Sequence, residues 1–314
     1  MSIAFTFPGQ GSQAVGMGKA LADAFPQAAA VFAEVDEALS QKLSTLMFEG
    51  PEADLTLTAN AQPALMAVSL AVVRVLEAEA GLDLARDAQF VAGHSLGEYS
   101  ALAAAGSFSL ADTARLLRQR GEAMQKAVPV GQGAMAALLG LDYETGVAVA
   151  AEAAGPSDVC QIANDNGGGQ VVASGHKAAV ERAVEIAKAK GARRALMLPV
   201  SAPFHCALMQ PAADAMREAL ARVTIRSPKV PLVANVLAAP ISEPDEIRKR
   251  LVEQVTGTVR WRESVAYMAS EGVTTFYEPG AGKVLSGLVK RIAEGASGIA
   301  IGQPVDIETF KSRP

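Results

Sequence analysis

One serine of this chain has a setting that favours nucleophilic chemistry. Ser95 lies in Gly93-His94-Ser95-Leu96-Gly97, between an apolar run at 89–93 and an alanine-rich segment predicted to be helical. A G-x-S-x-G pattern between a strand and a helix is typical of a nucleophile elbow, in which the glycines allow a sharp turn. The following helix would direct free N–H groups, first that of Leu96, toward a developing oxyanion. The alternative is an ordinary strand–helix turn with a capping serine.

The chain offers three histidines as the base that a serine hydroxyl needs. His205 is preferred, because it lies in an uncharged, proline-containing loop directly before a predicted helix; a buried structural histidine is the alternative. His176 is better explained as a surface capping residue before a helix. His94 adjoins the serine, but a sharp turn should direct its side chain elsewhere.

The third member of a catalytic triad has no clear candidate in the sequence. Asp214 and Glu218 follow His205 on the predicted helix and are local candidates only. A backbone or amide carbonyl could orient the imidazole instead. The three histidines and two cysteines form no paired cluster, so neither a metal nor another cofactor is expected.

Composition and charge narrow the possible classes of protein. Half of the 314 residues are apolar, which indicates a globular core, and the net charge of −5 without a basic block argues against nucleic-acid binding. The run 1–7 lacks the basic region of a signal peptide. The uncharged stretch 55–73 contains polar residues and a proline, so no membrane span is expected. With two widely separated cysteines, Cys160 and Cys206, we expect a cytoplasmic protein, and we expect a monomer.

The order of predicted elements indicates one α/β domain interrupted by a smaller one. Residues 1–127 and 200–314 are assigned to the α/β catalytic domain, and residues 128–199 to an inserted domain. Within the insertion the pattern is βαββαβ, which is typical of a ferredoxin-like fold. Its strands are expected at 134–139, 159–163, 170–173 and 193–198, and its helices at 143–154 and 178–190.

The larger domain shows alternating apolar strands and amphipathic helices. Arg120 borders the inward face of one of these helices, although composition alone would favour a solvated surface arginine. Strands are expected at 3–7, 89–93, 232–235 and 274–277, and helices at 17–24, 26–39, 63–80, 96–105, 110–126, 245–254, 262–271 and 283–292.

Several motifs together resemble the malonyl-CoA:acyl-carrier-protein transacylase family, commonly called FabD. They follow the family's order over nearly the whole chain, so their combination is far more specific than the elbow alone. The matching segments are Phe7–Gln13, Gly93–Leu102, Arg118–Gly121, Met124-Gln125, Asn164, Asn166, Gln170–Val172, Pro203, His205-Cys206, Gln254-Val255, Trp261, Glu278–Gly280 and Lys283–Leu285.

The resemblance implies a fold and a role for each site residue. The fold is a hydrolase-like parallel-sheet core with the ferredoxin-like insertion. Ser95 would carry the malonyl group as an ester, His205 would act as the base, and Arg120 would hold the malonyl carboxylate through a two-pronged ion pair. The remaining implied residues are Gln10 and Leu96, whose amides would form the oxyanion hole, Gln254, whose backbone carbonyl would orient the imidazole, and Asn164 and His94, which are expected at the substrate site.

The family's reaction moves malonyl from malonyl-CoA to the phosphopantetheine thiol of acyl carrier protein without a cofactor. Leu96 and Phe204 resemble malonyl-selective members, because a bulky residue before the histidine leaves little room for an α-methyl group. A carrier-docking patch is expected at Lys188, Lys190, Arg193 and Arg194. A serine hydrolase, an acyltransferase of different acyl preference and a scaffold with a relic elbow remain as alternatives.

Overall fold

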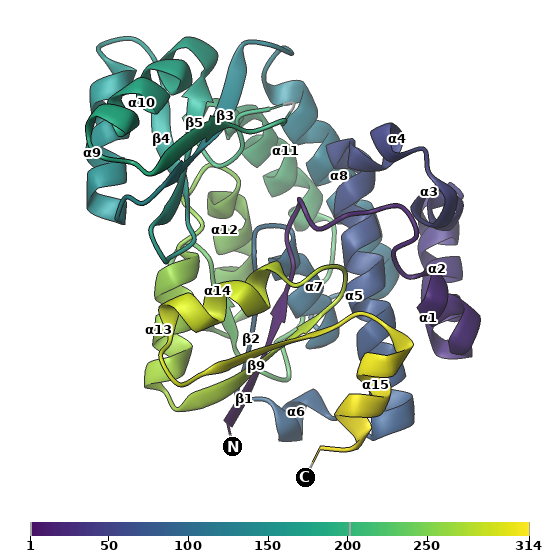
Figure 1. The fold of residues 1–314 in the computed structure, drawn as a ribbon. Helices are drawn as coiled ribbons and strands as arrows, with labels where there is room; N and C mark the ends of the chain where they lie inside the picture. The colour runs from purple at the N-terminus through teal and green to yellow at the C-terminus, as the bar shows by residue number, and fades with distance from the viewer. Residues whose placement is uncertain (1, 201, 314) are drawn as a thin grey trace.

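The larger part of the molecule is built on a parallel β-sheet between layers of helices (Figure 1). The computed structural model describes residues 2–200 and 202–313. Its six-stranded sheet has the order β10-β9-β1-β2-β7-β8, and all neighbouring strands are parallel except the β7–β8 pair. The strands are β1 (Ser2–Phe7), β2 (Phe90–Gly93), β7 (Leu232–Ala234), β8 (Ala239–Ile241), β9 (Val273–Pro279) and β10 (Ser297–Ile301).

Helices cover both faces of this sheet and bury its apolar residues in two core clusters. They are α1 (Lys19–Ala24), α2 (Pro26–Leu39), α3 (Leu43–Glu49), α4 (Glu52–Thr56), α5 (Thr58–Ala80), α6 (Leu84–Asp87), α7 (Gly97–Ala104), α8 (Leu110–Ala127), a 3₁₀ turn at Ala207–Met209, α11 (Gln210–Ala221), α12 (Pro244–Gln254), α13 (Trp261–Ser270), α14 (Val284–Ile292) and α15 (Pro304–Lys311).

Helix α5 is the central helix of the larger core. It begins at Thr58, five residues before the predicted start, and contains Pro63 in its second turn. By length and composition alone it could cross a membrane, but 83% of its most apolar window is buried inside the protein, as in the core helix of a soluble fold. Helix α8 crosses it closely at Gly121, where a Cβ would come within 2.6 Å of the Thr58 carbonyl oxygen. This close crossing brings the neighbouring Arg120 into the interior.

The smaller part is a four-stranded antiparallel sheet with two helices, at the upper left of Figure 1. Its strand order, β4-β5-β3-β6, is that of a ferredoxin-like fold, and its chain order is βαββαβ. The predicted fold class is therefore confirmed. The elements are β3 (Gly133–Leu139), α9 (Tyr143–Ala154), β4 (Cys160–Asp165), β5 (Gln170–His176), α10 (Lys177–Ala189) and β6 (Arg194–Met197), and the exact domain boundaries at 128 and 199 stay a prediction.

The sequence missed several peripheral elements. Strands β8 and β10 and helix α15 were not predicted, because β8 is three residues long with a central proline and β10 carries only weak apolar alternation. In contrast, β5 extends three residues beyond the expected end at 173, since it pairs with a strand on each side. The short helices α3, α4 and α6 were not predicted either, and Glu52 and Thr56 of α4 line the same cavity as Ser95.

Candidate active site

Ser95 occupies a strained turn between β2 and α7. Its φ angle is +54°, in the left-handed region that non-glycine residues rarely adopt. The two flanking glycines are sterically required. A Cβ on Gly93 would come within 1.9 Å of the Gly97 carbonyl carbon, and one on Gly97 within 2.2 Å of the Phe7 carbonyl oxygen. The glycines are therefore needed because the turn folds back on itself and its second glycine packs against the end of β1.

His205 is placed with its imidazole between the serine and a backbone carbonyl. Its Nε2 lies 2.8 Å from Ser95 Oγ, and its Nδ1 lies 2.8 Å from the carbonyl oxygen of Gln254. A carbonyl only accepts hydrogen bonds, so Nδ1 carries the proton and Nε2 is free to accept from the serine hydroxyl. His205 also has a positive φ, +57°, which turns its side chain into the site.

The pKa of His205 is lowered to about 3, first by burial and then by the positive charge of Arg120. The free imidazole is therefore neutral near pH 7. The acidic candidates Asp214 and Glu218 are both exposed on α11, and Asp214 pairs with Arg217 instead. The Gln254 carbonyl stands where a triad carboxylate would be.

Arg120 is a buried cation beside the nucleophile, with 1% of its surface exposed. One terminal nitrogen donates to Gln62 Oε1 at 2.8 Å, and the other donates to Gln254 Oε1 at 2.7 Å and to Ser95 Oγ at 3.1 Å. Within residues 2–200 and 202–313 its Nε has no hydrogen-bond partner and no carboxylate forms an ion pair with it. A buried charge held only by neutral oxygens is costly unless an anionic ligand completes it.

Backbone N–H groups near Ser95 could stabilise an oxyanion only if they do not already donate a hydrogen bond within the protein. The Ser95 amide donates to Asn235 Oδ1 at 2.9 Å, so it is already engaged. Leu96 follows at the start of α7, where helical N–H groups have no partner within the helix. The loop after β1 also approaches closely, since a Cβ on Gly9 would lie 2.8 Å from the His94 carbonyl oxygen. Gln10, next in that loop, donates from its side chain to Thr58 Oγ1 at 3.2 Å.

His94 and Asn164 complete the set of residues that the sequence assigned to the site. His94 is one of the residues that line the same cavity as Ser95, and its imidazole lies 5.7 Å from the Trp261 ring. Its Nε2 lies 2.9 Å from Asn166 Oδ1, and burial lowers its pKa. Asn164, two residues earlier on β4, also lines the cavity.

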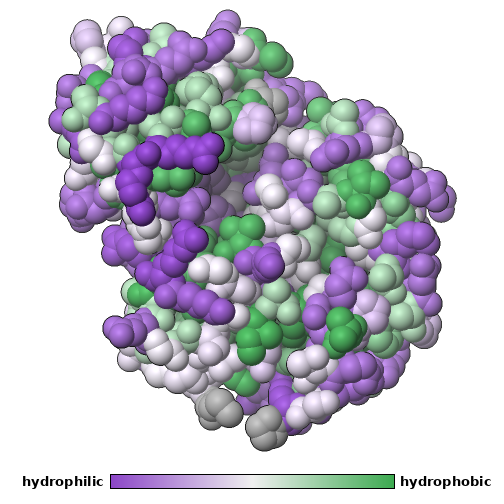
Figure 2. Space-filling model, in the orientation of Figure 1, coloured by the Kyte–Doolittle hydropathy of each residue, from purple (hydrophilic) through white to green (hydrophobic). Residues whose placement is uncertain are grey.

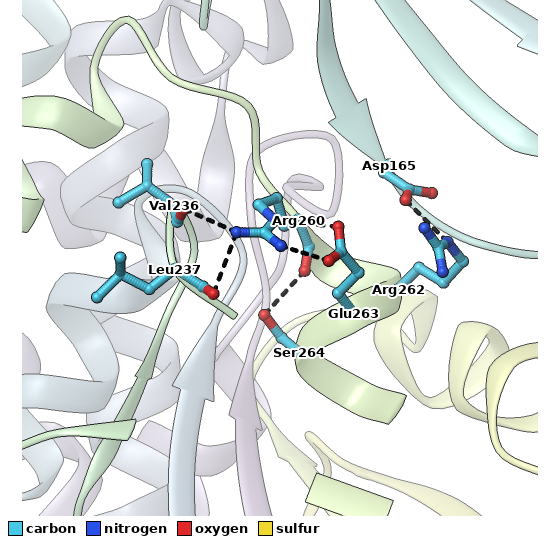
Figure 3. A network of polar contacts seen from close by, with 7 residues as sticks. All are labelled: Asp165, Val236, Leu237, Arg260, Arg262, Glu263 and Ser264. Atoms are coloured by element: carbon cyan, nitrogen blue, oxygen red, sulfur yellow. Dashed lines mark hydrogen bonds and ion pairs between the residues drawn. The ribbon is translucent and has the colours of Figure 1, made fainter. Parts of the chain in front are cut away.

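A network of polar contacts holds the end of β4 against the start of α13 and the loops beside it (Figure 3). Arg262 Nε donates to Asp165 at 2.8 Å, and the Asp165 amide donates to the Val259 carbonyl at 3.0 Å. Arg260 in turn binds Glu263 and the carbonyls of residues 236 and 237. Because Asp165 lies between Asn164 and Asn166, these contacts fix both asparagines at the site.

The site residues surround one cavity of about 550 Å³ between the two parts of the molecule. The space-filling view shows the surface hollowed between the small sheet and the larger part (Figure 2). The cavity is lined by Gln10, Gly11, Gln13, Glu52, Thr56, Gln62, His94, Ser95, Leu96, Arg120, Met124, Met135, Asn164, Leu198, Pro199, Val200, Phe204 and His205.

Three residues that the sequence analysis did not single out contribute to this arrangement. Gln62 holds Arg120, Asn235 holds the elbow through Ser95 and Gly93, and Glu98 contacts the Gln254 side chain. Asn235 follows an apolar strand and Glu98 lies within the elbow motif, so each position gives only a weak indication of a role at the site. Their partners lie 140 or more residues away, which no local pattern indicates.

The expected docking patch is partly neutralised. Lys188 pairs with Glu185 at 2.7 Å and Lys190 with Glu152 at 3.0 Å. Arg193 and Arg194 are exposed at the start of β6. Among the described residues no group of three or more His, Cys, Asp or Glu side chains could hold a metal ion.

Comparison with known proteins gives matches along nearly the whole chain. Residues 4–297 match the model of the acyl transferase domain family. The malonyl CoA-acyl carrier protein transacylase of Bacillus subtilis (strain 168) is 49% identical over 306 residues, 98% of this chain and 95% of that protein. The crystal structure of acyl-carrier-protein-S-malonyltransferase from Bartonella henselae has a TM-score of 0.96 and 59% identity, with 98% of each chain covered. The structure of a type II PKS acyl-carrier protein in complex with its malonyl-transacylase has a TM-score of 0.95 and 42% sequence identity, with 99% of each chain covered.

Proposed function

Because the chain belongs to the malonyl CoA-acyl carrier protein transacylase family, we propose that it transfers malonyl from malonyl-CoA to the phosphopantetheine thiol of an acyl carrier protein. The observation that carries the proposal is the buried Arg120 guanidinium, whose hydrogen bonds among the described residues go only to neutral oxygens and which lies 3.1 Å from Ser95 Oγ. A cation in this position suits an acyl group that itself ends in a carboxylate.

In the first half-reaction Ser95 Oγ attacks the thioester carbonyl and its proton passes to His205 Nε2. The oxyanion is stabilised by the amides of Leu96 and Gln10. When the C–S bond breaks, the departing CoA sulfur takes the proton from His205, and malonyl remains as an ester on Ser95. In the second half-reaction the phosphopantetheine thiol gives its proton to His205 and attacks the ester. Ser95 Oγ then leaves and recovers that proton.

The substrate carboxylate would also strengthen the base. Arg120 is the second-largest cause of the low pKa of His205. A carboxylate bound to the guanidinium compensates that charge, so the pKa of His205 should rise toward the working pH when malonyl binds. Substrate binding and base activation are in this way one event.

Three further features belong to the proposal. Phe204 lines the cavity beside His205 and should disfavour an α-methyl group, so malonyl is preferred over methylmalonyl. The chain acts as a cytoplasmic monomer with only transient carrier docking. Its product supplies fatty acid synthesis.

A serine hydrolase with the same elbow is the main alternative function. Transfer of malonyl to the carrier thiol distinguishes a transferase from a hydrolase. Malonyl-CoA should be mixed with the protein and a phosphopantetheine-bearing carrier, and the malonyl groups followed by mass spectrometry. Most should appear on the carrier thiol, and a carrier without phosphopantetheine should receive none. If the malonyl groups are released mainly as free malonate while the carrier stays unmodified, the protein is a hydrolase.

The acid side of the pH profile should be flat. Catalysis needs neutral His205, and a pKa lowered to about 3 keeps the free imidazole neutral well below pH 6.5. The rate constant kcat/KM for release of CoA from malonyl-CoA should therefore change less than about twofold between pH 5 and pH 7. It can be measured by trapping the CoA thiol in stopped flow. A tenfold fall for each pH unit below 6.5 would show instead an unperturbed histidine.

A further inference from the structure

Two side chains of opposite charge are buried beneath Ser95 without touching each other. Glu98 and Arg120 each expose 1% of their surface, and the ion pairs among the described residues do not include either of them. Glu98 lies in the first turn of α7, and Arg120 reaches the same region from α8. Buried charges are normally paired directly, so their separation calls for an explanation.

The Gln254 side chain lies between these two charges. Its Nε2 donates to Glu98 Oε2 and, at 2.9 Å, to the Ser95 carbonyl, while its Oε1 accepts from Arg120 at 2.7 Å. A carboxylate accepts hydrogen bonds, so Glu98 fixes the amide nitrogen toward itself and the amide oxygen toward Arg120. Arg120 is thereby held by neutral oxygens, and its donors are not occupied by a resident carboxylate.

We propose that Glu98 is the resident counter-charge of Arg120, and that it takes up one proton from solvent when the substrate carboxylate binds the guanidinium. The inference rests on the proposed function. In the free enzyme the ionised form of Glu98, which predominates above a pH of about 8, partly compensates the arginine through Gln254. In the malonyl complex the substrate carboxylate takes over this role, and protonated Glu98 leaves the buried charge balanced. Glu98 is thus a positioning residue, which acts through Gln254 and Arg120.

The titration of Glu98 fits this exchange. Burial raises its pKa to about 8, while Gln254, the Asn235 backbone and the charge of Arg120 act in the opposite direction. A substrate carboxylate would cancel the effect of Arg120 and add a second negative charge, so the pKa must rise further on binding. The substrate complex then holds more protons than the free enzyme, and affinity for malonyl should fall as the pH rises through about 8.

The other titratable groups around Glu98 do not change charge in that pH range. Burial raises the pKa of Tyr99, its neighbour on α7, and the pKa values of His205 and His94 are both lowered. Arg120 stays protonated. Because malonyl binding should also raise the pKa of His205, only the proton uptake that disappears in Glu98→Gln is assigned to Glu98.

Calorimetry in two buffers with different ionisation enthalpies measures this proton directly. Malonyl-CoA and acetyl-CoA should be titrated at pH 8 into the Ser95→Ala protein, which binds without turnover, and into the same protein with Glu98→Gln. Since half of Glu98 is ionised at its pKa, malonyl-CoA should bring uptake of up to about 0.5 proton beyond that of acetyl-CoA, which shares every group except the carboxylate. With Glu98→Gln, whose shape and hydrogen-bond acceptor remain, this difference should disappear.

Equal proton uptake with both ligands, or an unchanged difference in the Glu98→Gln protein, would overturn the proposal. If Glu98→Gln does not fold, the ratio of the malonyl-CoA and acetyl-CoA dissociation constants of Ser95→Ala decides instead. It should rise severalfold from pH 7 to pH 9.5, and a constant ratio would refute the exchange. Failure of the proposed function would look different, since the wild-type protein would then not pass malonyl to the carrier thiol.

Discussion

Replacing Arg120 with alanine should lower kcat/KM for malonyl-CoA by about 10²- to 10³-fold. The loss corresponds to about 3–4 kcal/mol, as expected when one partner of a buried, hydrogen-bonded charge pair is removed. Arg120 is fully buried, and its donors point at neutral oxygens and at the nucleophile. The reaction can be followed as CoA release with malonyl-CoA and, separately, with acetyl-CoA. Reactivity toward acetyl-CoA, which has no carboxylate to bind, should fall much less or rise.

A matched control is available on the same helix. Arg115 is exposed, pairs with Asp112 at the surface and donates to the Ala38 carbonyl at 3.3 Å, so Arg115→Ala should leave both substrates within about twofold of the wild type. Equal losses for malonyl-CoA and acetyl-CoA in Arg120→Ala would contradict a carboxylate clamp. They would indicate that Arg120 serves only to hold the fold or the serine.

The Ser95→Ala protein should lose about 10⁶-fold in kcat, as expected when the nucleophile of a serine enzyme is removed. Its fold should remain, because alanine meets the same cost as serine at a φ of +54° and no flanking glycine is changed. Binding of malonyl-CoA should also persist, since Arg120 and the backbone donors are retained. The measurement is single-turnover release of CoA at high enzyme concentration.

Ser100→Ala, on the helix that follows the Ser95 turn, provides the comparison. Ser100 is fully buried on α7, and its hydroxyl has no hydrogen-bond partner among the described residues. Removing that hydroxyl should leave CoA release unchanged. A similar loss in both variants would mean that α7 tolerates no change, and that the Ser95 hydroxyl has no special role.

The elbow could be predicted from the sequence because its physical requirement is local. Two glycines at fixed distance from Ser95, between an apolar strand and a helix, indicate a turn that only such residues permit. The ferredoxin-like insertion was predictable for a related reason: its six elements follow one another without interruption, and each has clear apolar periodicity. The fold class could therefore be predicted from the sequence alone.

The contacts between distant segments could not be predicted in this way. His205 was preferred over two other histidines only because its loop is uncharged, and the Gln254 carbonyl was assigned only through the family resemblance. A backbone carbonyl has no residue type, so no sequence pattern can indicate that it replaces a carboxylate. Burial of Arg120 is likewise set by a close helix crossing at Gly121, which a helical periodicity does not reveal.

The most peripheral elements were missed for a further reason. Short edge strands such as β8 and β10 owe their stability to a neighbouring strand, and their own sequences carry little β-signal. Glu98 belongs to the Gly93–Leu102 motif, but its partner Gln254 is 156 residues away, so the sequence indicates no role for it. The sequence does not indicate which side chains from distant segments contact each other.

The central claim is that Ser95 carries the malonyl group between two thiols, and intact-protein mass spectrometry tests it most directly. The wild-type protein mixed with malonyl-CoA should gain one malonyl group, mapped by peptide analysis to Ser95. That group should disappear when a phosphopantetheine-bearing carrier is added, and Ser95→Ala should gain none. Absence of the adduct on the wild type, or an equal adduct on Ser95→Ala, would contradict the account.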